Sequence, residues 1–170
     1  VAIGSRLAGV PYSVTLGAGK TYLGRAAPGV ADLTGTIITS DKKIAVFSGN
    51  RCGNVPTGVN ACDTLLEQLP PTEAWGKKYL SMPFAGRLNG DRFRILASTN
   101  GTTLQINGST VATLSRGAFY ETVLTGPAEI TADKPILVLQ FLHSRNFDGG
   151  SPPSPFNDPS MMVLYSYEQY

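Results

Sequence analysis

The sequence has few of the residues on which catalytic and metal sites depend. It holds one histidine, His143, and two cysteines among 170 residues. A metal site with several histidine ligands is therefore excluded, and so is a zinc site with four Cys and His ligands. The sequence has no GxSxG nucleophile elbow, and its acidic residues offer no pair to nominate for acid–base catalysis. We predict a protein that is not an enzyme, with no catalytic residues, no cofactor and no metal site.

Charged residues are scarce as well, at 15% of the chain against about 25% in a typical soluble domain. The net charge is +2, and no more than two basic residues are adjacent. Nucleic acid is therefore not an expected partner, because binding to phosphates needs a concentrated positive surface. The longest aliphatic stretch, residues 136–142, is interrupted by Gln140 and is far shorter than the ~20 residues of a spanning helix. We expect no membrane insertion.

Short runs rich in β-branched and aromatic residues alternate with turn residues along the chain. Three such runs, residues 93–98, 103–106 and 110–114, are joined by turns that contain Asn-Gly, a strong hairpin signal. We predict three consecutive antiparallel strands here. One short helix is predicted at residues 63–69, because Asp63 can cap it and a Pro-Pro pair would end it. The predicted fold is an all-β antiparallel β-sandwich with one short helix.

Two parts of the sequence resemble each other. Residues 14–22 match residues 112–120 at four positions, each 98 apart, as Thr15 and Thr113 are. An LTG triplet and an SDK or ADK turn follow in both copies. The copies, about residues 12–50 and 110–143, are each too short to build a core. We therefore predict a single sandwich domain over residues 1–170, with an internal pseudo-two-fold repeat.

Two segments lie outside the copies: the insert at residues 51–90 and the loop at residues 144–160. Cys52 and Cys62 lie in the insert and enclose a turn rich in Gly, Asn and Pro, which favours a disulfide; two unpaired thiols are the alternative. The loop is long, rich in Pro and Gly, and carries two phenylalanines that are costly to expose without a partner. The alternative is that both rings pack onto the sandwich.

We expect these two segments to bind a ligand, since loops on a rigid scaffold carry function. The candidate ligand-binding residues are Arg51, Trp75, Arg145, Asn146, Phe147, Asp148, Phe156, Asn157 and Asp158. A sugar would use an aromatic face together with planar polar side chains. Oxygens of Asp148, Asn157 and Asp158 also suit Ca²⁺, but their spacing is not that of an EF-hand.

Four runs resemble the N-terminal domain of the IgGFc-binding protein family and its bacterial relatives. They are DLTGTIITSDKKIAVFSGNRC, CDTLLEQLPPTEAWGKKYLSMPFAGR, ITADKPILVLQFL and NDPSMMVLYSYEQY. The resemblance covers the chain from about Tyr12 to its end. It implies a secreted or surface-exposed module, often one part of a large multidomain adhesin, with Cys52 and Cys62 paired and with no catalytic activity.

The residues and the resemblance together predict a non-catalytic binding module of an extracellular or cell-surface adhesin. Its partners would be a protein or glycan ligand and the neighbouring domains of a larger chain. The alternative is a structural spacer or oligomerisation module of an extracellular fibre, in which the chain would form homo-oligomers. The chain begins at Val1 without a signal-type segment, so we expect a fragment or a processed product.

Overall fold

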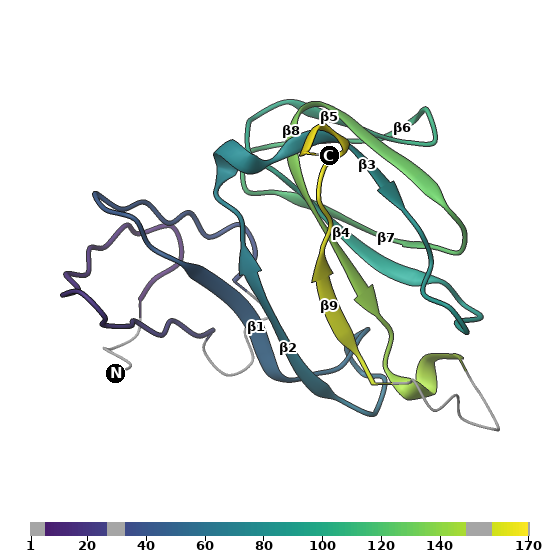
Figure 1. The fold of residues 1–170 in the computed structure, drawn as a ribbon, viewed down its shortest axis with the longest axis horizontal. Coiled ribbons are helices and arrows are strands. Elements are labelled where there is room, and N and C mark those ends of the chain that lie inside the picture. The colour runs from purple at the N-terminus through teal and green to yellow at the C-terminus, as the bar shows by residue number, and fades with distance from the viewer. Residues whose placement is uncertain (1–5, 27–32, 149–157, 170) are drawn as a thin grey trace. The chain divides into compact units, whose positions relative to one another are not determined.

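The computed structural model describes residues 6–26, 33–148 and 158–169, and the chain divides into two compact units, Val1–Thr34 and Gly35–Tyr170 (Figure 1). The described part of the first unit contains turns but neither strand nor helix. One turn is closed by a hydrogen bond from Lys20 N to Gly17 O at 3.1 Å. The extent of a single sandwich domain over residues 1–170 stays a prediction.

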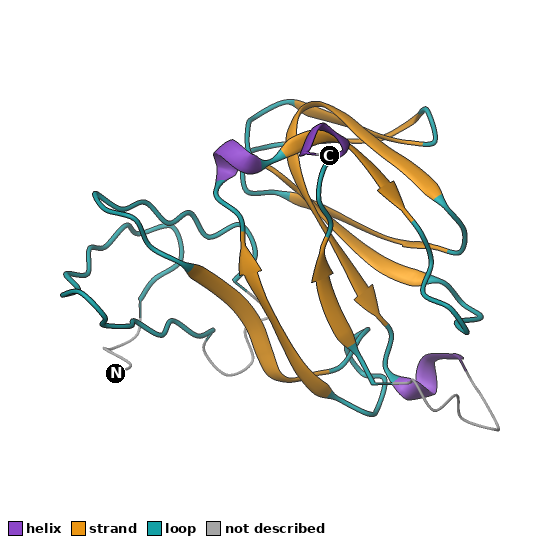
Figure 2. Cartoon of the chain, viewed as in Figure 1, coloured by secondary structure: helices purple, strands orange, loops and turns teal. Residues whose placement is uncertain are grey.

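The second unit is built from β-strands and short 3₁₀ turns (Figure 2). The strands are β1 (Val46–Gly53), β2 (Asp63–Leu69), β3 (Gly76–Ser81), β4 (Asp91–Ala97), β5 (Thr102–Ile106), β6 (Ser109–Leu114), β7 (Phe119–Leu124), β8 (Ala128–Leu142) and β9 (Ser160–Val163). The 3₁₀ turns are η1 (Thr72–Ala74), η2 (Arg145–Asp148) and η3 (Tyr167–Gln169). The prediction of an all-β antiparallel sandwich is confirmed.

The strands form two antiparallel sheets. Strands β1 and β2 pair with each other, and a seven-stranded sheet has the order β6-β5-β8-β4-β7, with β3 and β9 also paired to β8. Alternate residues of β8 point to opposite faces, as the geometry of a strand requires. The unit has two hydrophobic cores, one enclosed by the larger sheet and one between the two sheets. Ile136 and Val138 belong to the first core, and Leu137, Leu139 and Phe141 belong to the second. Because both faces of its second half are buried, residues 136–142 of β8 form an almost continuous apolar run.

The short helix predicted at residues 63–69 is wrong, because these residues form β2. Leu65 and Leu69 point toward the core between the sheets, whereas Leu66 is exposed. Residues 65, 67 and 69 are the more buried ones and residues 66 and 68 are exposed, and this period of two matches a strand and not a helix. Pairing with β1 and burial of the two leucines outweigh the capping signal of Asp63, whose side chain accepts a hydrogen bond from Thr64 N at 2.6 Å.

The three strands predicted between residues 93 and 114 are present, but their order in the sheet is not consecutive. Strands β5 and β6 form the predicted hairpin, with Asn107 and Gly108 at positive φ in its turn. Strands β4 and β5 are not neighbours, because β8 lies between them. The turn sequence indicates that the chain reverses direction, but it does not show that a later strand, β8, pairs between β4 and β5.

The internal repeat is only partly visible in the structure. The second copy forms β6, β7 and β8, whereas the described residues of the first copy form no strand before Val46. The prediction of two equivalent β units is therefore wrong for residues 12–26 and 33–45. The turns do follow the repeat: the hydrogen bond from Lys20 N to Gly17 O has its counterpart 98 positions later, from Ala118 N to Ser115 O at 2.9 Å.

Candidate functional site

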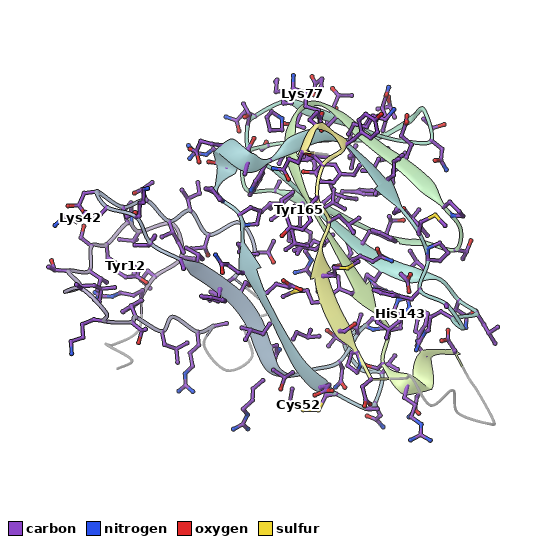
Figure 3. All side chains as sticks on the ribbon, in the orientation of Figure 1. Tyr12, Lys42, Cys52, Lys77, His143 and Tyr165 are labelled. Atoms are coloured by element: carbon purple, nitrogen blue, oxygen red, sulfur yellow. A yellow bond between two sulfur atoms is a disulfide. The ribbon has the colours of Figure 1, made fainter. Side chains whose placement is uncertain are left out.

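Three segments of the second unit meet at one end of the sandwich, which we call the loop end. They are the disulfide loop (residues 53–62), the β3–β4 loop (residues 82–90) and η2. Ser144 ties the first segment to the third, because its N–H donates to Val55 O at 2.7 Å and its hydroxyl oxygen accepts from Val55 N at 2.9 Å. His143 and Cys52, which flank these contacts in sequence, both lie in the lower part of Figure 3.

An ion pair fixes the β3–β4 loop to η2. The Nε atom of Arg87 lies 2.7 Å from Oδ2 of Asp148, and the Arg87 side chain is only 1% exposed. Arg87 also donates from Nη2 to the His143 carbonyl oxygen at 3.1 Å, and Asn89 N donates to Asp148 Oδ1 at 3.1 Å. These contacts hold the backbone of two loops in one arrangement, so their exposed side chains are presented from a rigid support.

The single histidine is part of this support. His143 is buried, its Nδ1 lies 2.9 Å from the Gly90 carbonyl oxygen, and its ring stacks on Phe147 with the ring centroids 3.7 Å apart. Burial lowers the pKa of His143 and outweighs the hydrogen bond to Gly90, which acts in the opposite direction. The imidazole is therefore neutral at pH 7 and its contacts are those of a packed core residue.

Cys52 and Cys62 form the predicted disulfide, with their Cα atoms 5.0 Å apart. The bridge closes the loop that carries Val55, and Val55 is buried in the core between the sheets. The disulfide therefore braces the first of the three segments, whereas the ion pair joins the other two. Within residues 6–26, 33–148 and 158–169, no group of three or more His, Cys, Asp or Glu side chains is placed to hold a metal ion.

Three candidate residues take part in packing. Trp75 donates from Nε1 to the Pro70 carbonyl oxygen at 3.1 Å and packs against the core between the sheets. Phe147 stacks on His143, and Asp148 is the partner of Arg87. The alternative that a loop phenylalanine packs onto the sandwich is thus observed for Phe147.

The remaining candidates divide between exposed residues and residues that the structure does not describe. Arg51, Arg145, Asn146 and Asp158 are exposed. Arg145 and Asn146 are the first two residues of η2, and Asp148 at its end is the partner of Arg87. Phe156 and Asn157 lie outside the described residues, and a role for them in binding stays a prediction.

Sequence reasoning missed two exposed apolar side chains on the β3–β4 loop. Leu88 is 79% exposed, and Met82 is largely exposed as well. Leu88 follows Arg87 directly, so the ion pair with Asp148 also fixes its position. The available signal was an apolar residue next to Asn89-Gly90 in a turn, where a core residue is not expected.

The family model described as IgGFc binding protein matches residues 1–170. The chain belongs to this family. The human IgGFc-binding protein is 30% identical in an alignment 158 positions long, and the match covers 79% of the chain and 3% of the human protein. The chain thus spans a small fraction of the length of this relative. No solved structure matches the chain.

The described part of this family member contains only short 3₁₀ turns as helical elements. None of its helices is long and apolar enough to cross a membrane.

Proposed function

We propose that the chain is a non-catalytic binding module of a secreted or surface-exposed protein, and that its loop end binds a protein ligand. The observation that carries this proposal is the exposed side chain of Leu88 beside the buried Arg87–Asp148 ion pair. A large apolar side chain held on an ordered loop loses little conformational entropy when a partner covers it. Such a side chain is therefore suited to be the centre of an interface.

The neighbouring residues suit the rim of a protein interface. Arg145 and Asn146 are exposed at the start of η2, and Met82 is exposed on the β3–β4 loop that carries Leu88. Protein interfaces combine an apolar centre with a polar rim and are enriched in Met and Arg. We include Arg51 and Asp158 as further exposed residues of the proposed binding surface.

A protein ligand fits this surface better than a glycan. Sugar binding needs an accessible aromatic face, and the two candidate aromatic residues that the structure describes, Trp75 and Phe147, are engaged in packing. The name of the human relative also refers to a protein ligand, the Fc part of immunoglobulin G. We extend that class of ligand to this chain as part of the proposal.

The proposed location rests on the disulfide. Disulfides persist in oxidising compartments and are rare in the cytosol. Cys52–Cys62 supports the loop end, so the proposed binding surface would be best ordered outside the cell. A role within a larger adhesin belongs to the same proposal.

Binding of the purified chain to a panel of extracellular proteins tests the proposal, with the Fc fragment of immunoglobulin G as the first member. Biolayer interferometry measures the affinity, and circular dichroism verifies folding. For a ligand that binds, we expect Leu88→Asp to weaken the affinity at least tenfold, as replacement of a central interface residue does. The matched control is Leu66→Asp, at an exposed leucine on β2.

Two results would reject the proposal. One is a folded chain that binds no protein of the panel. The other is a ligand whose affinity is unchanged by Leu88→Asp and by Arg145→Glu.

A further inference from the structure

The two hairpins β1–β2 and β8–β9 have the same register. When 92 is subtracted from the residue numbers of β8 and 95 from those of β9, every β8–β9 pair becomes a β1–β2 pair. The pairs Leu139–Val163, Gln140–Met162, Phe141–Met161 and Leu142–Ser160 correspond to Phe47–Gln68, Ser48–Glu67, Gly49–Leu66 and Asn50–Leu65. The shift of 92 is the one that relates the SDK and ADK turns in the sequence.

The equivalence continues beyond the hairpins. The turn η1 spans residues 72–74 and η3 spans residues 167–169, again 95 positions apart. Four residue pairs and a 3₁₀ turn thus follow the same shifts, although neither 3₁₀ turn was visible as part of the sequence repeat. Strand β1 is therefore the counterpart of the C-terminal half of β8.

The strands paired with β1 differ from those paired with the C-terminal half of β8. Residues 136–141 of β8 pair with β4, from Ala97–Ile136 to Arg92–Phe141, and β9 pairs on the other edge. In the part of the chain that the structure describes, β1 pairs with β2 alone. The edge of β1 that corresponds to the β4 side of β8 thus has no strand beside it among these residues.

Residues 44–47 at the start of this edge keep the apolar pattern of β8, whereas Gly49 and Asn50 stand at the counterparts of Phe141 and Leu142. Ile44 and Phe47 correspond to Ile136 and Leu139. The β8 residues are 0% and 9% exposed, whereas Ile44 and Phe47 are 54% and 59% exposed. Exposed large apolar side chains at an open strand edge and just before it indicate a surface that a partner covers.

We infer that residues 44–49, which are the first residues of β1 and the two residues before it, bind an extended segment of the β4 type, supplied by a strand of a partner protein that is not already paired within its own sheet. The segment would pair antiparallel with β1 in the register of β4 on β8 and would carry the pattern of residues 91–97, DRFRILA. In this register the counterpart of Arg94 lies opposite Phe47. An arginine at that position suits an aromatic neighbour, since the Arg94 guanidinium already lies 4.5 Å from the centroid of the Phe119 ring.

The β4 strand of a second copy of this chain does not suit this role. In each copy β4 is paired on one edge with β7 and on the other with β8, and Phe93 and Ile95 are buried in the core. Releasing β4 would unfold its own sheet. The occupant is therefore a β4-type strand of a partner that is unpaired in its own sheet, so the inference concerns a second binding surface and goes beyond the ligand proposed for the loop end.

The test is a fusion in which a second copy of residues 76–101 precedes Val1 through a flexible linker. Hydrogen–deuterium exchange measures the amide protection of residues 44–49. We expect at least a tenfold slower exchange there than in the unfused chain, with unchanged exchange in β8. The matched control carries Ile95→Pro in the added copy only, which removes a backbone donor and disrupts the strand.

A synthetic peptide of residues 89–98 added to the unfused chain provides a second arm that does not depend on how the fusion folds. The inference holds if the fusion or the peptide protects residues 44–49 and the same fusion or peptide with Ile95→Pro does not. It is overturned if neither arm protects them while β8 stays protected. It is also overturned if protection rises with the concentration of the unfused chain alone, because the occupant would then be a second copy.

Discussion

The guanidinium of Arg87 lies 2.7 Å from the carboxylate of Asp148, and this ion pair joins two loops that are 61 positions apart in sequence. The Arg87 side chain is almost fully buried, and its neighbour Leu88 is among the most exposed apolar residues of the described chain. A buried charge pair and an exposed leucine thus occupy consecutive positions. The first fixes the loop, and the second is available to a partner.

Replacing Asp148 tests how much the ion pair contributes to stability. Asp148→Ala leaves the buried charge of Arg87 without this carboxylate, so we expect the free energy of unfolding to fall by about 3 kcal/mol. Urea denaturation followed by circular dichroism measures the change. Asp158→Ala, at an exposed aspartate, is the control, with an expected change within about 0.5 kcal/mol. Equal effects of the two substitutions would contradict the role assigned to the pair.

The buried histidine predicts a dependence of stability on pH. The pKa of His143 is lowered in the folded state by burial, so the unfolded chain takes up a proton more readily. Stability is therefore complete above the ordinary histidine pKa of 6.5 and decreases as the pH falls below it. Urea titrations between about pH 7.5 and about pH 5 should show this decrease. His143→Gln should flatten the profile, and an unchanged slope in the variant would contradict the prediction.

A second decrease is expected at lower pH from Glu121. Burial raises the pKa of this carboxyl, but hydrogen bonds from Arg94 and Arg92 outweigh burial, and the net pKa lies below the ordinary value of 4.5. The stabilisation is present above this value and is lost as the pH falls through the lowered pKa. Glu121→Gln should remove the dependence in this acid range and leave the histidine range intact. If Glu121→Gln instead changed the stability profile between about pH 7.5 and about pH 5, the acid-range decrease could not be assigned to Glu121.

The disulfide should stabilise the loop end without being required for the sheets. Reduction of Cys52–Cys62 opens a short loop, for which we expect a loss of about 2–3 kcal/mol in the free energy of unfolding. The paired substitution Cys52→Ser with Cys62→Ser should give a similar value. Exchange of β8 amides should remain slow in the variant, and a molten β8 would show that the disulfide is needed for the whole sandwich.

A buried tyrosine hydroxyl connects β3 to β8. Tyr79 donates to the Ile136 carbonyl oxygen at 2.6 Å and accepts a hydrogen bond from Gly76 N at 3.0 Å. Tyr79→Phe leaves both backbone groups without this hydroxyl, so we expect a loss of about 1–3 kcal/mol. Thermal denaturation compares it with Tyr165→Phe, at an exposed tyrosine, which should be neutral. A Tyr79→Phe variant with unchanged stability would contradict the role assigned to this hydroxyl.

The sequence was sufficient for the fold class and for the local turns. Alternation of apolar residues and the Asn107-Gly108 turn predicted the β5–β6 hairpin correctly, because both signals act over a few residues. Residues 63–69 were misread as a helix, since a strand paired with β1 is stabilised by contacts that no local pattern records. The position of β8 between β4 and β5 was equally hidden, because it depends on pairing over long sequence separations.

The candidate site also combines a feature that local sequence predicts with features that depend on the fold. The disulfide could be predicted from the spacing and composition around the two cysteines. The Arg87–Asp148 pair could not, because it joins residues that only the fold brings together. Trp75 and Phe147 are half-buried and make packing contacts, and their role in binding stays a prediction. The exposure of Leu88 likewise depends on the fold.

The central claim, that the loop end binds a protein, is tested most directly by a hydrogen–deuterium exchange footprint of the chain with and without a bound ligand from the panel. We predict slower exchange in residues 82–90 and 145–148 on binding, with no change in β1 and β2. A footprint confined to β1 and β2, or to the first unit, would contradict the claim.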